Sequence, residues 1–139
     1  MNILFITPSE VQPLNGGLER ITASLSQTLN MHYGHVCYFR NLQDNYTEHQ
    51  WESYLLNHAI DVIIAQGADK RVAQLLPTLR QVINRLERKI VLLFAFHSNP
   101  GVELAKMDYP ALFYRLCHGV NIKDKALIAA ATLSDRYIT

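Results

Sequence analysis

Four short apolar runs, each followed by a segment of different periodicity, most strongly constrain the fold of this chain. They are residues 3–6 (ILFI), 35–39 (HVCYF), 61–67 (DVIIAQG) and 89–96 (KIVLLFAF). Runs that are apolar at nearly every position are typical of parallel strands covered by helices on both faces. The alternation predicts an α/β domain, a Rossmann-like three-layer arrangement with a mostly parallel sheet, in which the first run is a central strand.

Helices are predicted between these runs. In residues 18–29 the apolar positions recur every three or four residues, which indicates an amphipathic helix. We expect this helix to end near Gly34, because glycine tolerates the positive φ of a helix C-terminus. Residues 48–59 predict a short helix, and residues 69–88 predict a long helical segment. Pro77 removes one helical hydrogen bond, so a kink or two shorter helices are expected there.

The last third of the chain has weaker patterns. Residues 97–101 (HSNPG) predict a loop, and residues 109–119 predict a helix. The alanine-rich part that follows fits either a helix or a fifth strand over residues 126–133. We prefer the strand, because Ser134 followed by Asp135 would be a reasonable start for a further helix.

Composition excludes several classes of protein. With 139 residues, 49% of them hydrophobic, 18% charged and a net charge of +1, the chain should fold as one globular domain. Lys and Arg are spread along the chain, so nucleic acid is not an expected partner. Cys37 and Cys117 are far apart, which fits a reducing compartment. The start has no basic leader and no run reaches the length of a membrane span, so we expect a cytoplasmic protein.

Strand order determines where a ligand would bind. The common order for such a domain puts the second and third strands on one side of the first and the fourth on the other. Ligands of open parallel sheets bind beyond the carboxyl ends of the strands, where the direction of winding reverses. The crevice is therefore expected between the first and fourth strands, with Gly16 and Gly17 facing His97.

The stretch PLNGGLER (residues 13–20) allows two interpretations. Gly16 and Gly17 could leave bare backbone at a helix N-terminus, which suits a phosphate or diphosphate. They could equally serve only a turn that needs positive φ. Glu19 would oppose a bare phosphate, whereas Arg20 could offset Glu19 or bind an anion. No third glycine follows in the spacing of the dinucleotide fingerprint, so dinucleotide binding is disfavoured.

His97 is the candidate for proton transfer or for a hydrogen bond to a ligand, because it follows the most apolar strand at the expected crevice. The alternative is a histidine bonded to its own loop. No pair of histidines has the spacing of a metal site on a helix, so no metal is expected. A phosphoacceptor receiver domain would need a carboxylate at the end of the third strand, but Asp61 lies at its beginning.

The chain resembles the amino-terminal domain of GT-B fold glycosyltransferases, specifically the retaining group of family four. The likeness rests on the Gly-Gly-x-Glu-Arg stretch at residues 16–20 and on His97, Asn99 and Pro100 after the apolar strand. It implies that Gly16, Gly17, Glu19, Arg20 and Asn99 bind the donor or substrate, and that His97 is the catalytic contact to the sugar. It also implies a sugar nucleotide as donor, a saccharide or lipid-linked acceptor, and no cofactor or metal.

Two functions follow as expectations. In the first, residues 1–139 are the acceptor-side domain of a two-domain glycosyltransferase and a fragment that is inactive alone, because the family's pair of glutamates eight positions apart is absent. Lipid-linked acceptors would bring such a protein to the inner face of the membrane, although no basic amphipathic helix stands out. In the second, the chain is a non-catalytic α/β binding or interaction module of flavodoxin-like topology.

Overall fold

The computed structural model describes residues 1–8, 11, 17–66, 70–95 and 136–138 of the chain. In chain order, the elements are β1 (Asn2–Thr7), α1 (Gly17–Tyr33), β2 (Val36–Asn41), the 3-10 helix η1 (Leu42–Asp44), α2 (Glu48–Asn57), β3 (Val62–Gln66), α3 (Lys70–Arg85), β4 (Val91–Ala95) and β5 (Arg136–Ile138).

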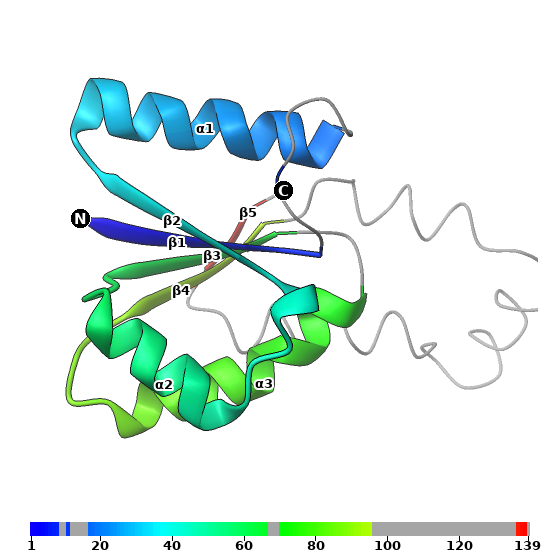
Figure 1. Ribbon diagram of the computed structural model, residues 1–139, viewed down its shortest axis with the longest axis vertical. Coiled ribbons are helices and arrows are strands. Elements are labelled where there is room, and N and C mark those ends of the chain that lie inside the picture. The colour runs from blue at the N-terminus through cyan, green and yellow to red at the C-terminus, as the bar shows by residue number, and fades with distance from the viewer. Residues whose placement is uncertain (9–10, 12–16, 67–69, 96–135, 139) are drawn as a thin grey trace, which may run out of the picture.

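The sheet has five strands in the order β2-β1-β3-β4-β5, and every pairing is parallel. Helix α1 covers one face, while α2 and α3 cover the other, so the domain has three layers (Figure 1). The predicted α/β class and central position of the first strand are confirmed. Among the helices that the structure describes, none combines the length and apolar character needed to cross a bilayer.

The predicted strand order was wrong, because β3 lies between β1 and β4. Right-handed crossovers explain the observed order. A crossover moving one way across a parallel sheet puts its helix on one face, and a crossover moving the other way puts it on the opposite face. Since α1 and α2 cover opposite faces, the crossover after β2 moves across the sheet in the opposite direction to the crossover before β2 (Figure 1). The sequence could not fix this reversal, because both orders satisfy the handedness rule.

The core has two parts, one on each face of the sheet. Along β1, Leu4 and Ile6 belong to the larger cluster under α2 and α3, while Ile3 and Phe5 belong to the smaller cluster. This division follows from the alternation of side chains along a strand. The largest fully buried side chains include Trp51 of α2, together with Phe5, Phe94, Leu4, Ile6, Leu55, Ile60, Ile63, Leu76, Leu79 and Leu92.

The predicted helix ends were largely correct. Gly34 follows α1 with a φ of +66°, as expected for a glycine at a helix C-terminus. Thr47 and Gln50 form a reciprocal capping box at the start of α2. Pro77, however, lies inside a single helix. Of the two expected outcomes, the division into two shorter helices was therefore wrong, whereas the kink stays a prediction. Its exposed position leaves the apolar face of α3 intact, and tertiary packing of that face outweighs the lost hydrogen bond.

The helix predicted to open at Ser134 was also wrong. Arg136–Ile138 instead forms β5, which pairs with β4 from Leu93 to Ala95. Pairing with the edge of β4 therefore outweighs the local sequence signal for a helix N-terminus at Ser134. The loop predicted at residues 97–101, the helix at 109–119 and the strand or helix at 126–133 lie outside the described residues.

Candidate functional site

Gly17 is the first residue of α1 and is exposed. It has no positive φ, and a Cβ added to it would meet nothing within 4 Å among the described residues. Turn geometry therefore does not explain this glycine, and neither does a close approach of described side chains. Glu19 lies in the first turn of the same helix, whereas exposed Arg20 borders a shallow apolar depression on its outer side with Ile21 and Leu25.

The predicted crevice between the first and fourth strands does not exist, because β3 separates β1 from β4. In the observed order the direction of winding reverses between β1 and β3. Gly16, His97 and Asn99 lie outside the described residues, so the structure does not test whether His97 faces Gly17. Their predicted roles, and the expectation that no metal or cofactor is used, stay predictions.

A cleft of about 440 Å³ lies at the carboxyl ends of β1 and β2. We call it the rim cleft, and its walls come from the last residue of β1, the end of β2, η1 and Val11. The lining residues are Thr7, Val11, Phe39, Arg40, Asn41, Gln43 and Asp44. Parallel sheets present their ligand sites at this edge. Hydroxyl, amide, guanidinium and carboxylate groups thus converge there beside one aromatic ring.

Backbone capping makes the floor of the rim cleft rigid. The side chain of Asn41 accepts a hydrogen bond from the Gln43 N–H at 2.8 Å, and Asp44 accepts one from the Asn41 N–H at 3.1 Å. These bonds form a capping box around η1. Asn45 ends the turn in the left-handed conformation, with φ at +49°, which asparagine tolerates better than most residues. The side chains of Asn41 and Asp44 are therefore held against the backbone of this turn.

Arg40 forms the charged wall of the rim cleft. Its guanidinium carbon lies 4.6 Å from the centroid of the Tyr54 ring and 5.7 Å from that of Tyr46. A guanidinium over aromatic faces is attracted to their negative charge density. Burial raises the pKa of the Tyr54 hydroxyl, and the nearby charge of Arg40 opposes that rise. Tyr54 is therefore a neutral platform beneath the cation at physiological pH.

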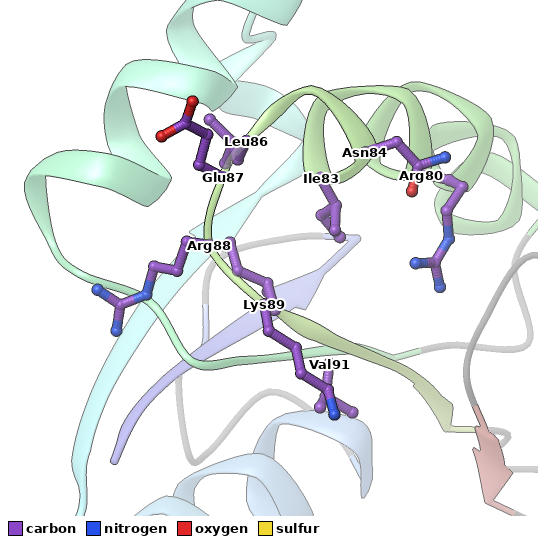
Figure 2. Close-up of a pocket in the computed structure, with 9 residues that line it drawn as sticks. Arg80, Ile83, Asn84, Leu86, Glu87, Arg88, Lys89 and Val91 are labelled. Carbon is purple, nitrogen blue, oxygen red and sulfur yellow. The ribbon is translucent and has the colours of Figure 1, made fainter.

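A larger hollow of about 660 Å³ lies at the opposite, amino edge of the sheet, between the end of α3 and the start of β4 (Figure 2). Arg80, Arg88 and Lys89 make it basic, with Glu87 as the acidic member. The carbonyl end of α3 attracts cations there, so stabilisation of the helix is enough to explain the basic residues. This hollow is therefore a weaker candidate than the rim cleft, despite its size.

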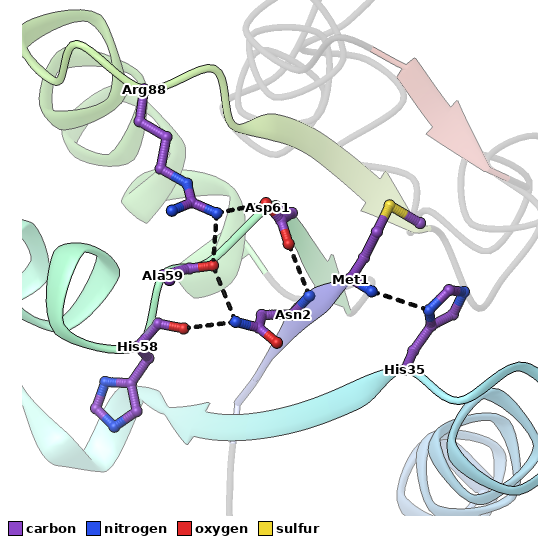
Figure 3. Close-up of polar contacts among 7 residues, drawn as sticks. All are labelled: Met1, Asn2, His35, His58, Ala59, Asp61 and Arg88. Carbon is purple, nitrogen blue, oxygen red and sulfur yellow. Dashed lines mark hydrogen bonds and ion pairs between the residues drawn. The ribbon is translucent and has the colours of Figure 1, made fainter.

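Arg88 already has partners at that edge (Figure 3). Its guanidinium donates to the Asp61 carboxylate at 2.5 Å and to the Ala59 carbonyl at 2.8 Å. Asp61 also accepts the Asn2 backbone N–H at 2.8 Å. The Asn2 hydrogen bond, followed by Arg88, holds the pKa of Asp61 below its usual value. These contacts connect the starts of β1, β3 and β4, and their role is structural.

Sequence reasoning missed the rim cleft. The signals were present in the run Phe39 to Asp44, where an aromatic residue, an arginine and an asparagine end β2 at the ligand-binding edge and two more polar side chains follow. The prediction placed the ligand site at the loop after the first strand instead, because of the paired glycines Gly16 and Gly17. The position of Asp61 just before β3 was predicted correctly, which keeps the receiver-domain alternative weak.

The fold and the cleft define an α/β domain with an open parallel sheet and a polar site at its carboxyl edge. Two curated relatives are both named chaperone protein ClpB. The protein from Corynebacterium diphtheriae is 42% identical over an alignment of 86 residues that covers 58% of this chain and 10% of that protein. The protein from Enterococcus faecalis is 73% identical over 26 residues, which is 19% of this chain and 3% of that protein. The chain thus spans at most a tenth of the length of these relatives.

No family model matches the chain, and no solved structure matches it. The resemblance to GT-B glycosyltransferases was therefore wrong: the partial matches are to ClpB chaperones and not to a glycosyltransferase. Short motifs built on glycine and proline recur for reasons of turn geometry, which explains the misleading likeness. Sugar transfer, with its sugar nucleotide, its acceptor and its missing second domain, stays a prediction without this support.

Proposed function

We propose that this chain is a non-catalytic α/β binding module that holds a small polar ligand in the rim cleft. The observation that carries the proposal is the place of the cleft, at the carboxyl ends of β1 and β2. Open parallel sheets bind ligands at this edge, where loops converge on a rigid scaffold. A volume of about 440 Å³ lies within the range usual for small-molecule sites.

The lining supports a binding role more than a catalytic one. Asn41 and Gln43 offer amide donors and acceptors, and Phe39, a residue that is 39% exposed, offers an aromatic side chain. Among the described residues that line the cleft there is no histidine or cysteine to act as base or nucleophile near neutral pH. Such a set of groups orients a ligand through hydrogen bonds.

The test is a screen of small polar compounds by protein-observed NMR, followed by titration of any compound that binds. Binding should shift the backbone amides of Thr7 and of residues 39–44 in a saturable way. Gln43→Trp should fill the cleft and weaken binding by about tenfold or more, because the exposed Gln43 side chain borders it.

The matched control is Gln81→Trp, at a glutamine on α3 that is also exposed and does not line the rim cleft. It should bind like the unaltered chain. Shifts that map away from β1 and β2, or binding that survives Gln43→Trp unchanged, would contradict the proposal.

The curated relatives favour a second candidate, a contribution to chaperone function. The observation is the identity of 42% over 86 residues to a protein named as a chaperone. If this candidate is correct, the chain should slow the aggregation of a chemically denatured reporter enzyme at equimolar concentration. An inert protein of similar size serves as the control, and equal aggregation in both samples argues against this candidate.

A further inference from the structure

The guanidinium of Arg40 is fixed by aromatic rings. It lies against Tyr54 and Tyr46, and Tyr46 in turn packs edge-on against Trp51 at 5.0 Å between centroids. Trp51 and Tyr54 are 2% and 7% exposed, so both belong to the core. A cation held on such a platform loses little further conformational entropy when it binds a ligand.

The charge of Arg40 has no carboxylate partner among the described residues. Two ion pairs in this part of the chain join Arg85 to Glu48 and Arg88 to Asp61. One hydrogen bond of Arg40 runs from a terminal nitrogen to the Phe39 carbonyl at 3.3 Å. Its buried Nε–H has no described acceptor. A guanidinium carries five N–H donors, so most of its donor capacity is unused by described groups.

We propose that the rim cleft binds the oxyanion group of its ligand, a phosphate or a carboxylate, through Arg40. The inference rests on the proposed binding function and names the ligand class. The planar fork of an arginine matches both kinds of oxyanion, and a guanidinium that packs on aromatic rings and has no carboxylate partner among the described residues is suited to that task.

The carboxylate of Asp44 partly offsets the positive charge of Arg40, and this restricts the class of ligand that the rim cleft can bind. Its carboxylate also lines the cleft, but one oxygen accepts the Asn41 backbone N–H. The remaining negative charge weakens the binding of a bare anion. A ligand with hydroxyl or amine donors next to its oxyanion would satisfy Arg40 and Asp44 together, with Asn41 and Gln43 between them.

The experiment uses the whole chain, labelled with ¹⁵N, and three probes at constant ionic strength: inorganic phosphate, acetate and glycerol. Phosphate or acetate should shift the Arg40 side-chain Nε–Hε signal and the amides of Asn41 and Gln43 in a saturable way. Glycerol should produce no such shift. Comparison of phosphate with acetate shows which oxyanion is preferred, and a preference for either supports the inference.

Arg40→Met should weaken the anion-dependent shifts by about tenfold or more, because hydrogen bonds to charged groups are the strong ones. Arg40→Lys should retain part of the binding. If the methionine variant does not fold, Tyr46→Leu provides the test: it keeps the charge but removes one wall of the platform, and a several-fold weakening is expected.

Anion shifts that map to Lys89 and Arg80 in the hollow at the amino edge would overturn the inference, as would unchanged binding by Arg40→Met. The two proposals fail separately. If neutral compounds bind and Gln43→Trp abolishes that binding, while Arg40→Met has no effect on anions, the cleft is a ligand site but not an oxyanion site.

Discussion

Asp61 accepts a hydrogen bond from Arg88 across 27 residues of chain, at the amino edge of the sheet (Figure 3). Both side chains are about one-third exposed, at 35% and 38%, so solvent weakens the pair. The carboxylate has a second anchor in the Asn2 N–H. This pair therefore connects the start of β3 to the start of β4 and to β1.

The first prediction concerns Asp61→Asn and pH. The pKa of Asp61 is lower in the folded state than its ordinary value of 3.8, so the unfolded chain takes up the proton first as pH falls. The stabilisation is thus complete above about pH 4 and is lost as pH falls through the depressed folded pKa. Urea unfolding should show a loss of about 1 kcal/mol for Asp61→Asn at pH 7, shrinking towards zero in acid.

Glu48→Gln is the control for that measurement. Glu48 pairs with Arg85 at 3.1 Å, but both side chains are more exposed, at 43% and 52%. Its effect at pH 7 should stay within about 0.5 kcal/mol. Equal losses for the two variants would show that the contacts of Asp61 add nothing specific.

The second prediction compares two glycines. Gly34→Ala should destabilise the chain by about 1 kcal/mol, because its φ of +66° strains any residue with a Cβ. Gly17→Ala should be neutral or stabilising by up to about 1 kcal/mol, because this position is helical and open. Thermal unfolding of both variants provides the check, and a lower midpoint for Gly17→Ala than for Gly34→Ala would refute it.

The third prediction concerns a buried polar contact between α1 and β3. Thr22 is fully buried, and its hydroxyl oxygen lies 2.9 Å from Oε1 of buried Gln66. Thr22→Val keeps the shape but removes the hydroxyl, so we expect a loss of about 1–3 kcal/mol in the free energy of unfolding. Thr28→Val, at an exposed position of the same helix, should change it by less than about 0.5 kcal/mol. Similar values for both variants would show that the contact is unimportant.

Much of the fold was predictable because burial determines local patterns. A strand covered on both faces needs apolar residues at every position, and β1 shows this in Ile3, Leu4, Phe5 and Ile6. The sign of φ at Gly34 was predictable for a similar local reason. Strand order was not, because the side of β1 on which β3 pairs depends on packing between α1, α2 and the sheet.

The candidate site was harder to predict than the fold. Arg40 is the fifth residue of β2, and from the sequence alone a charged residue there is interpreted as an ordinary solvated side chain. Its value as a binding group comes from Tyr54 of α2, which follows it by fourteen residues, and only the fold brings the two together. Short motifs such as the paired glycines carry no such three-dimensional information, and they led to the wrong family.

The last prediction uses Trp51, the single tryptophan of the chain, as a reporter on this region. Its side chain is 2% exposed and borders a cavity of about 80 Å³ with Asn41, which also lines the rim cleft. Its fluorescence should be blue-shifted relative to the urea-unfolded chain and protected from acrylamide.

Tyr46→Ala removes the ring packed edge-on against the indole, so the emission should shift to the red and quenching should increase, with far-UV circular dichroism unchanged. Tyr33→Ala, at a 67% exposed position, should leave the emission unchanged. Quenching in the unaltered folded chain as strong as in the unfolded chain would contradict the buried position of Trp51.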